Sequence, residues 1–412
     1  MKNVRFLEMK ETGQMYWLVQ GVLAVVILLG IAAAHHMEVN GHWVTGMNNQ
    51  IVWGLPHVFA VFLIVTASGE LNLASIASVF GKAPYKPLSR LSALVAIAHM
   101  AGGLMILVLD LGHPDRLIVA MTHFNLKSIF TWNILLYTGF FALAAVYLWT
   151  MMERRFNPYA KAAGLMVFIW RVVLTTGTGS IFGFLVARDA YNAAIMAPMF
   201  IVMSFSYGTA IYLMTLETLS FWGDRHIGEV LITRLKNLLG IFIGASFYFF
   251  LAYHLTNLYV AQKHGVEYFL LAGDTIYPWL FWVGQILIGT LLPLGLLYSP
   301  MARSRLVVYL ACLLVVVGGL AQMYVTIIGG QAYPLTLFPG YDVTSSFSDG
   351  QIGYYCPTVY EAMLGISGFA VAAFLVILAS RMLPFLPASL EDADVDHRLI
   401  AKTTNSTAIS AV

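Results

Sequence analysis

The sequence predicts an all-α integral membrane protein with about ten transmembrane helices. Apolar residues make up 59% of the 412 residues and charged residues only 10%, whereas soluble globular proteins carry about 25% charged residues. The mean hydropathy of +0.79 agrees. Apolar stretches of roughly 20 residues, the length that a helix needs to cross a bilayer, recur along the whole chain. So few charges cannot cover a surface that faces water.

Ten stretches meet this length criterion: 16–34, 51–80, 88–111, 128–152, 160–187, 191–221, 238–262, 276–299, 305–329 and 359–383. The first resembles a signal peptide, because three basic residues precede it and three alanines, 32–34, follow it. Its apolar stretch is long for a signal peptide, and nine further spans follow. We therefore expect an uncleaved helix.

The distribution of basic residues predicts the orientation. With the N-terminus on the cytoplasmic side, 17 Lys and Arg residues fall on that side, four fall on the opposite side, and Arg171 lies within a span. Positive charge concentrates on cytoplasmic loops, so both termini are expected to be cytoplasmic. A net charge of +2 without a basic tract gives no reason to expect a nucleic-acid partner. Two cysteines, Cys312 and Cys356, are too few for an iron–sulfur or zinc site of their own.

Polar side chains at membrane depth are costly, and they often mark ion or proton pathways. Six such residues stand out in the spans: His57, Glu70, His99, Arg171, Glu217 and His254. Glu70, His99, Arg171 and Glu217 are candidates for a proton pathway. Arg171 is too deep to reach the surface easily, so it must pair with a carboxylate or with carbonyl groups inside the bundle. We expect Glu70 to be its partner. A lone His254 is equally compatible with a packing role. Haem is not expected, because His57 and His99 differ in depth by about two turns.

A motif closes the third span: Leu109-Asp110-Leu111-Gly112-His113-Pro114-Asp115-Arg116. Gly112 and Pro114 are typical of a helix end. Asp110 lies in the last turn, where the helix dipole disfavours a negative charge. Arg116 or the proton of a ligand would have to compensate it. A helix terminus with an ion pair between Asp110 and Arg116 is the plain structural interpretation.

This motif resembles the signature of the NrfD/PsrC membrane subunits. The segments Trp53-Gly54-Leu55-Pro56-His57 and Ser128-Ile129-Phe130-Thr131-Trp132 are similar to the same family. The late loop, with its run from Tyr333 to Val343 and then from Ser345 to Gly350, resembles the DsrP/HmeB group within it. DsrP belongs to the DsrMKJOP complex of dissimilatory sulfur metabolism.

The resemblance implies two four-helix bundles with an added helix at each end. The implied divisions are 1–50 (extra helix and outer loop), 51–187 (first bundle), 191–329 (second bundle), 330–358 (outer loop), 359–388 (extra helix) and 389–412 (cytoplasmic tail). We expect the outer loop to fold over the outer mouth or to dock a partner, and the tail to be frayed. The implied location is a bacterial or archaeal cytoplasmic membrane.

The resemblance also implies a quinone site near the outer face. Menaquinone or ubiquinone would be the substrate, and no intrinsic haem or iron–sulfur cluster or metal is expected. The implied quinone-binding residues are Trp53, Gly54, His57, Asp110, His113 and Arg116. Gly54 stands where related reductases place an Asn, which leaves the detailed hydrogen bonding to the quinone open. Direct catalytic residues are not assigned.

The implied partners belong to a multi-subunit oxidoreductase. They are a ferredoxin-like iron–sulfur subunit on the outer face, a multihaem cytochrome c, further membrane and cytoplasmic subunits, and membrane lipids. On this interpretation the protein is the quinone-reactive subunit of the complex and not a complete enzyme alone. The alternatives are the anchor of a molybdopterin polysulfide-reductase-type enzyme, a structural anchor whose quinone site has degenerated, and a secondary transporter. Against the transporter, matching pairs of broken helices are not apparent in the two halves.

Overall fold

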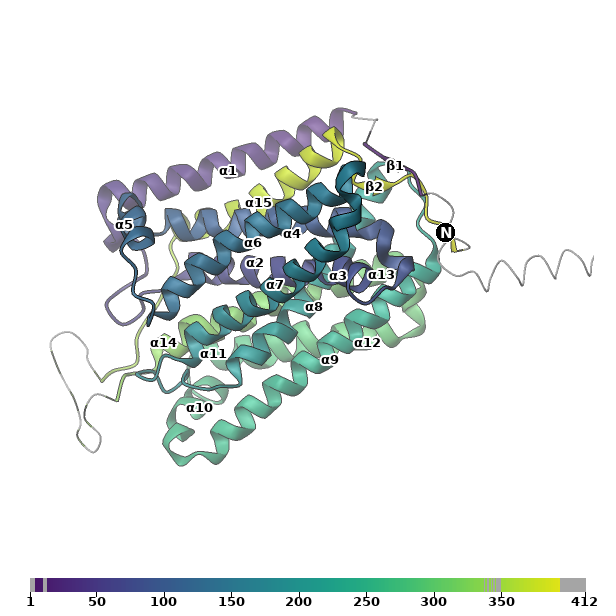
Figure 1. The fold of residues 1–412 in the computed structure, drawn as a ribbon. Coiled ribbons are helices and arrows are strands. Elements are labelled where there is room, and N and C mark those ends of the chain that lie inside the picture. Colours follow the sequence, from purple (N-terminus) through teal and green to yellow (C-terminus); the bar gives the residue numbers. More distant parts are fainter. Residues whose placement is uncertain are drawn as a thin grey trace, which may run out of the picture.

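The computed structural model describes residues 4–9, 13–336 and 350–392, together with 338, 341, 343 and 345. Within this part of the chain, ten helical segments are long and apolar enough to cross a membrane, which confirms the predicted fold class. They form one bundle (Figure 1). The segments are α1 (Gln14–Asn40), α2–α3 (Leu55–Glu70, Asn72–Ser78), η2–α4 (Ala83–Leu88, Ser89–Leu109), α6 (Ile129–Met152), η4–α7 (Arg154–Tyr159, Ala160–Gly183), α8 (Met196–Trp222), α9 (Glu229–Tyr259), α11–η6–α12 (Ile276–Trp279, Leu280–Leu291, Leu292–Tyr298), α13–η8–α14 (Arg305–Tyr324, Val325–Gly329, Gly330–Ala332) and α15 (Val359–Met382).

Several boundaries differ by a few residues from those expected, and two of the differences have a clear cause. Helix α9 begins at Glu229 instead of residue 238, because its first turns carry charged side chains that a hydropathy criterion leaves out. The ninth span continues as a helix to Ala332, so the outer loop begins at Tyr333 and not at residue 330.

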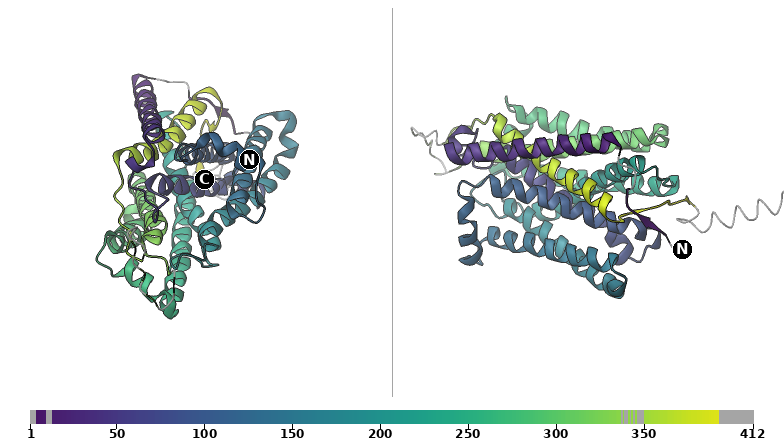
Figure 2. Two further views of the ribbon diagram at one scale, coloured as in Figure 1. Left: turned by 90° about the vertical axis from the view of Figure 1, so that its left-hand side faces the viewer. Right: turned by 90° about the horizontal axis from the view of Figure 1, so that it is seen from above.

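Both described chain ends lie at one end of the bundle, which we call the terminal end (Figures 1 and 2). There β1 (Phe6–Leu7) pairs antiparallel with β2 (Leu386–Pro387). The opposite end, which carries the start of α2 and the short helices α5 (Leu117–Thr122) and α10 (His264–Leu271), is called the His57 end.

The start of the predicted frayed tail is ordered. The amide of Gly228 donates a hydrogen bond to the carbonyl of Leu390 at 2.6 Å. The amide of Val230 donates to Asp392 Oδ1 at 2.9 Å. Residues 389–392 are thus held by the segment before α9, and the prediction of a frayed tail was wrong for them. Residues 393–412 lie outside the described part of the chain.

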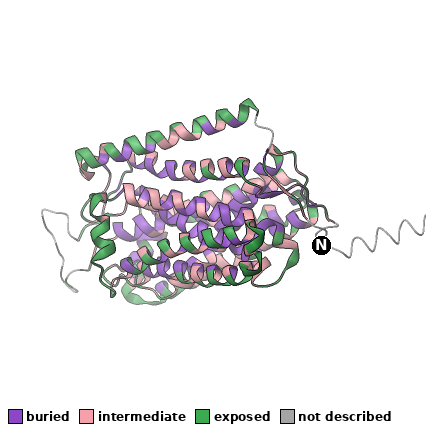
Figure 3. Ribbon diagram, turned by 45° about the horizontal axis from the view of Figure 1, so that its top comes forward, coloured by how far each residue is buried: buried purple, intermediate pink, exposed green. Residues whose placement is uncertain are grey.

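Helix α2 lies at the centre of the bundle, where it packs against α4, α8 and α15. Its contact with α8 is a close backbone approach through Gly69 and Gly208. A Cβ on Gly69 would overlap the carbonyl oxygen of Ser204, and a Cβ on Gly208 would overlap the backbone nitrogen of Glu70. Small residues at helix crossings allow such approach in membranes. Helix α1 lies mainly against α15, and much of its surface is exposed (Figure 3).

Candidate functional site

The start of α2 and the end of α4 bring together two residues of the expected quinone site. Helix α2 begins at Leu55 with Pro56 in its first turn, where a missing N–H costs nothing. This turn carries His57. Asp110 caps α4 at its C-terminus, and its Oδ2 lies 2.8 Å from Nδ1 of His57. The Asp110 side chain is only 1% exposed, whereas that of His57 is 20% exposed.

The His57–Asp110 contact corrects the expected ion pair with Arg116. Helix α4 ends at Leu109 and a new turn follows, η3 (Pro114–Arg116), whose Arg116 is exposed. His113 is also exposed and lies 3.7 Å from Asp115. Asp110 is therefore balanced by the neighbouring helix and not by its own loop. The structure does not bring His113 or Arg116 to His57.

The carboxylate of Asp110 has unused hydrogen-bonding capacity. The contact with His57 has the distance of an ion pair but lacks the alignment of a hydrogen bond. Among the described residues, neither oxygen of Asp110 nor Nδ1 of His57 has a hydrogen-bond partner. Leaving a buried polar atom unpaired costs about 1–3 kcal/mol. The Asp110 carboxylate and the His57 imidazole can thus form hydrogen bonds with a ligand.

Aromatic rings form one wall beside the pair. The rings of Trp53 and His57 are stacked, with centroids 6.1 Å apart and planes at 26°. Phe130 and Phe182 contact the Trp53 ring edge-on. The predicted Trp53 is therefore at the site, and the rings present a flat apolar surface next to polar groups, as binding sites for aromatic ligands do.

Gly54 is in close contact with the segment around the start of α15. A Cβ at this position would lie 2.5 Å from Glu361 Oε1 and 2.9 Å from the Tyr355 hydroxyl. A larger side chain would displace the loop that precedes α15. Gly54 therefore allows this loop to approach, which explains why an Asn does not stand here.

The loop before α15 holds the start of α2, a role that was not predicted from the sequence. The Tyr355 hydroxyl accepts the amide of Leu55 at 2.6 Å and donates to Glu361 Oε1 at 2.7 Å. The other oxygen of the buried Glu361 accepts the amides of Gly46 and Thr358. Burial, reinforced by the Glu361 carboxylate, raises the pKa of Tyr355, so this hydroxyl stays a donor at neutral pH. The spacing of Thr358 and Glu361 is that of a capping box, and it could have revealed the contact.

Two further positioning residues were also not predicted. The Gln331 side chain accepts the amides of Val52 and Trp53 and donates to the carbonyl of Trp53, all at 3.0 Å. Nε2 of His42 lies 3.1 Å from the carbonyl oxygen of Asp110, and so binds the C-terminal end of α4. Neither contact has a local signal, because each joins segments far apart in the sequence.

Deeper in the bundle, the expected pairing of Arg171 with Glu70 was wrong. Nδ1 of His99 lies 2.9 Å from Glu70 Oε1. Arg171 instead donates to the carbonyl of Ser68 at 3.1 Å and to Asn72 Oδ1 at 2.6 Å. Positions 68 and 72 are four residues apart and share one helix face, whereas position 70 faces elsewhere. Glu70 therefore turns toward α4 and Arg171 approaches from α7.

The remaining candidates lie in the second half of the sequence. Glu217 contacts Arg305 at 3.4 Å at the terminal end, apart from Glu70 and His99. His254 is hydrogen-bonded to the buried Glu267 at 2.7 Å, and Asn257 donates to the other oxygen of Glu267. Like His99, His254 therefore has a buried carboxylate partner. Glu267, on the short helix α10, was not predicted.

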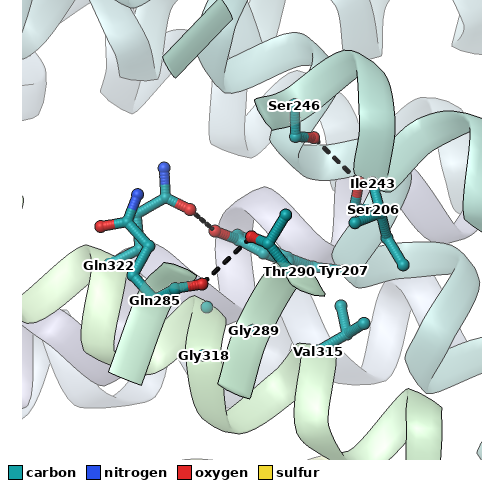
Figure 4. A pocket seen from close by; sticks show the side chains of 11 residues that line it. Ser206, Tyr207, Ile243, Ser246, Gln285, Gly289, Thr290, Val315, Gly318 and Gln322 are labelled. Atoms are coloured by element: carbon teal, nitrogen blue, oxygen red, sulfur yellow. Dashed lines mark hydrogen bonds between the residues drawn. The ribbon is translucent and has the colours of Figure 1, made fainter. Parts of the chain in front are cut away.

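A small polar cavity lies between α8, α9, η6 and α13 (Figure 4). Its volume of about 20 Å³ suits a single water molecule. Tyr207 donates to Gln322 Oε1 at 2.5 Å and Ser206 contacts Ser246 at 2.9 Å on its walls. It is not part of the His57 site. In the described ranges, no three His, Cys, Asp or Glu side chains gather as a metal site.

The family described as polysulphide reductase, NrfD, matches residues 43–334, more than half of the sequence. The chain belongs to the NrfD family. The matched region begins just before the Trp53–His57 segment and ends just after Gln331, so it contains the whole His57–Asp110 pair and its aromatic wall.

This NrfD-family protein is similar to several known proteins along most of its length. It is 27% identical to the Hdr-like menaquinol oxidoreductase integral membrane subunit of Archaeoglobus fulgidus, over 93% of its own length and 97% of that protein. It is 22% identical to the menaquinone reductase integral membrane subunit of Nitratidesulfovibrio vulgaris, over 88% and 90%. It is 24% identical to a component of the polysulfide reductase of Wolinella succinogenes, over 69% and 96%. With its ten spans, it is a multi-pass integral membrane protein.

Proposed function

We propose that this protein is the quinone-reactive membrane subunit of a multi-subunit redox complex. The observation that carries the proposal is the buried carboxylate of Asp110, which lies against His57 and has unused hydrogen-bonding capacity beside an aromatic wall. The names of the relatives, a menaquinol oxidoreductase subunit and a menaquinone reductase subunit, support the same class of substrate.

Oxidation of a quinol to a quinone releases two protons and two electrons. His57 would hydrogen-bond one ring oxygen and accept its proton, because an imidazole can change its protonation state near neutral pH. Asp110 would stabilise the resulting imidazolium and pass its proton to water at the His57 end, which leaves His57 free to accept the second proton. The electrons would pass to a redox partner docked at the His57 end. Reduction of a quinone is the same sequence of steps in reverse.

The proposal predicts that the purified subunit binds a quinone analogue. A hydroxyquinoline-N-oxide inhibitor should quench tryptophan fluorescence saturably, because Trp53 stacks on His57 at the site. The Trp53→Phe variant should bind the inhibitor but lose most of the quenching. Trp279→Phe, which changes an exposed ring on α11, is the matched control. If neither the wild type nor the Trp279→Phe control shows saturable quenching, a quinone site on this subunit is excluded.

We further propose a proton route from the His99–Glu70 pair toward the terminal end. Two hydroxyl groups lie beyond this pair. Ser92 donates to the backbone carbonyl of Glu70 at 2.6 Å and accepts the amide of Ala74, and Ser78 donates to the backbone carbonyl of Ala74 at 2.8 Å. Because backbone groups do not relay protons, water would carry the proton from the Glu70 carboxyl group along these hydroxyls. Arg171, held by Ser68 and Asn72, would keep this part of α2 in place beside the route.

Replacing Glu70 by Gln should uncouple charge separation from electron transfer. In proteoliposomes with the intact complex, we expect Glu70→Gln to keep most quinol turnover but to lower the membrane potential formed per electron. The exposed carboxylate of Glu153 supplies the control, Glu153→Gln. A normal potential per electron in Glu70→Gln would rule out this route, whatever the turnover.

The finer proposals concern the complex. We propose that the His57 end faces the outside of a prokaryotic cytoplasmic membrane and both termini face the cytoplasm, as the basic residues indicate. A ferredoxin-like iron–sulfur subunit would dock at the His57 end, together with a multihaem cytochrome c, in a DsrP-like complex of dissimilatory sulfur metabolism. The second candidate is the anchor of a polysulfide-reductase-type enzyme, favoured by the similarity to the Wolinella succinogenes polysulfide reductase component.

A further inference from the structure

A wide cavity opens at the terminal end, far along α2 and α4 from His57. Its volume is about 800 Å³. The N-terminal segment, the connection from α3 to α4, the end of α6 and the start of α7 enclose it. Volumes of roughly 300–1,000 Å³ are typical of sites that hold organic molecules. The proposed proton route ends at Ser78 in the wall of this cavity, but neither that route nor the quinone site accounts for a space of this size.

The charges that line this cavity are all positive. Lys86, Arg90 and Lys161 line it, and among the described residues none of the lining side chains is an Asp or a Glu. Arg90 is fixed in the wall, since it donates to the carbonyl of Met151 at 2.8 Å and lies 4.0 Å from the centre of the Phe6 ring. Lys86 and Lys161 are exposed. The cavity therefore suits an anionic group that two exposed lysines and one fixed arginine could surround.

The cavity also lies at the depth of a membrane surface. It adjoins the ends of three membrane spans, α4, α6 and α7. Exposed aromatic side chains flank it in the sequence: Trp149 is 54% exposed and Tyr159 is 64% exposed. Trp and Tyr are enriched where a membrane meets water. Basic pockets between helices at this depth bind the head groups of acidic lipids.

We infer that this cavity binds the phosphate head group of an anionic phospholipid. The head group would lie among Lys86, Arg90 and Lys161, and its acyl chains would leave toward the exposed apolar surface near Trp149. This is independent of the redox chemistry at His57, and the site requires neither a quinone nor a partner subunit.

The test compares two double variants of the full-length protein, purified in mild detergent and stripped of lipid. Lys86→Gln with Lys161→Gln removes two charges from the cavity. Lys236→Gln with Arg303→Gln removes two charges from the same end of the bundle outside the cavity lining. Native mass spectrometry then measures binding of added phosphatidylglycerol, with phosphatidylcholine as the neutral lipid.

The wild type and the Lys236/Arg303 variant should bind phosphatidylglycerol equally and in preference to phosphatidylcholine. The Lys86/Lys161 variant should bind it about 30-fold more weakly, since each lysine near an acidic lipid is worth about a factor of five. Equal losses in both variants would mean a general charge effect and would overturn the inference. So would equal binding of the two lipids, or displacement of phosphatidylglycerol by inorganic phosphate, which would indicate a soluble anion.

Discussion

Replacing His57 by Ala should reduce quinol-dependent electron transfer by about 100-fold, because general bases typically contribute 10²–10⁴-fold to a rate. Asp110→Asn should cause a loss of similar order, since it removes the carboxylate 2.8 Å from the imidazole but keeps the shape of the side chain. The measurement is the rate at which the intact complex transfers electrons from a menaquinol analogue to its acceptor.

A variant with both replacements tests whether His57 and Asp110 act together. Residues that act as one unit give non-additive effects, so His57→Ala with Asp110→Asn should cost little more than His57→Ala alone. His123→Ala is the control, because His123 is exposed at the same end and its ring is hydrogen-bonded to the neighbouring Thr122. Multiplied losses in the double variant would show that the two residues act separately. Wild-type rates and unchanged quinone affinity in His57→Ala would exclude His57 from the reaction.

Replacing both Gly69 and Gly208 by Ala should have the largest effect on folding. Each added Cβ would overlap backbone atoms of the facing helix, so relief requires α2 and α8 to move apart. Overpacking typically costs about 1–3 kcal/mol per site, and here the displaced atoms belong to the backbone beside Glu70. We expect a strong loss of folded protein, measured as the yield of monodisperse protein and as its thermal unfolding temperature.

The matched control for the glycine variants replaces two other helical glycines by Ala. A double replacement of Gly21 and Gly244 by Ala adds the same groups where no atom lies within 4 Å. This control should fold as well as the wild type, because alanine favours helices over glycine. Similar behaviour of the two double variants would mean that the close approach of α2 and α8 is not required.

The sequence predicted the fold well because membrane spans are local features. Ten apolar stretches and the distribution of basic residues depend only on neighbouring residues, and the structure confirms the ten spans. The sequence predicted His57, Asp110 and Trp53 as single residues of the site, but it did not predict which of them contact one another. Asp110 was assigned to Arg116, its neighbour in the motif, whereas its partner is on α2.

Arg171 illustrates the same limit. From the sequence it required a buried carboxylate or buried carbonyl groups, and Glu70 was the predicted partner. The structure instead provides a carbonyl and an amide oxygen, and Glu70 pairs with His99. Which face of a helix meets which neighbour is decided by packing between distant segments. For the same reason Gln331 and Glu361, which hold the start of α2, carried no signal that hydropathy could detect.

The pairing of α1 with α15 has a consequence for biosynthesis. Helix α1 has its main packing surface on α15, the tenth of the described spans. During synthesis it must therefore remain in the bilayer, surrounded by lipid, while eight other spans are inserted and assembled. The exposed side chains of α1 are mostly apolar, so the helix is stable in lipid before α15 is present. Its backbone polar groups are hydrogen-bonded within the helix and need no partner from the rest of the protein. Assembly of this bundle thus finishes at both ends of the sequence at once, when α15 arrives beside α1 and β2 pairs with β1.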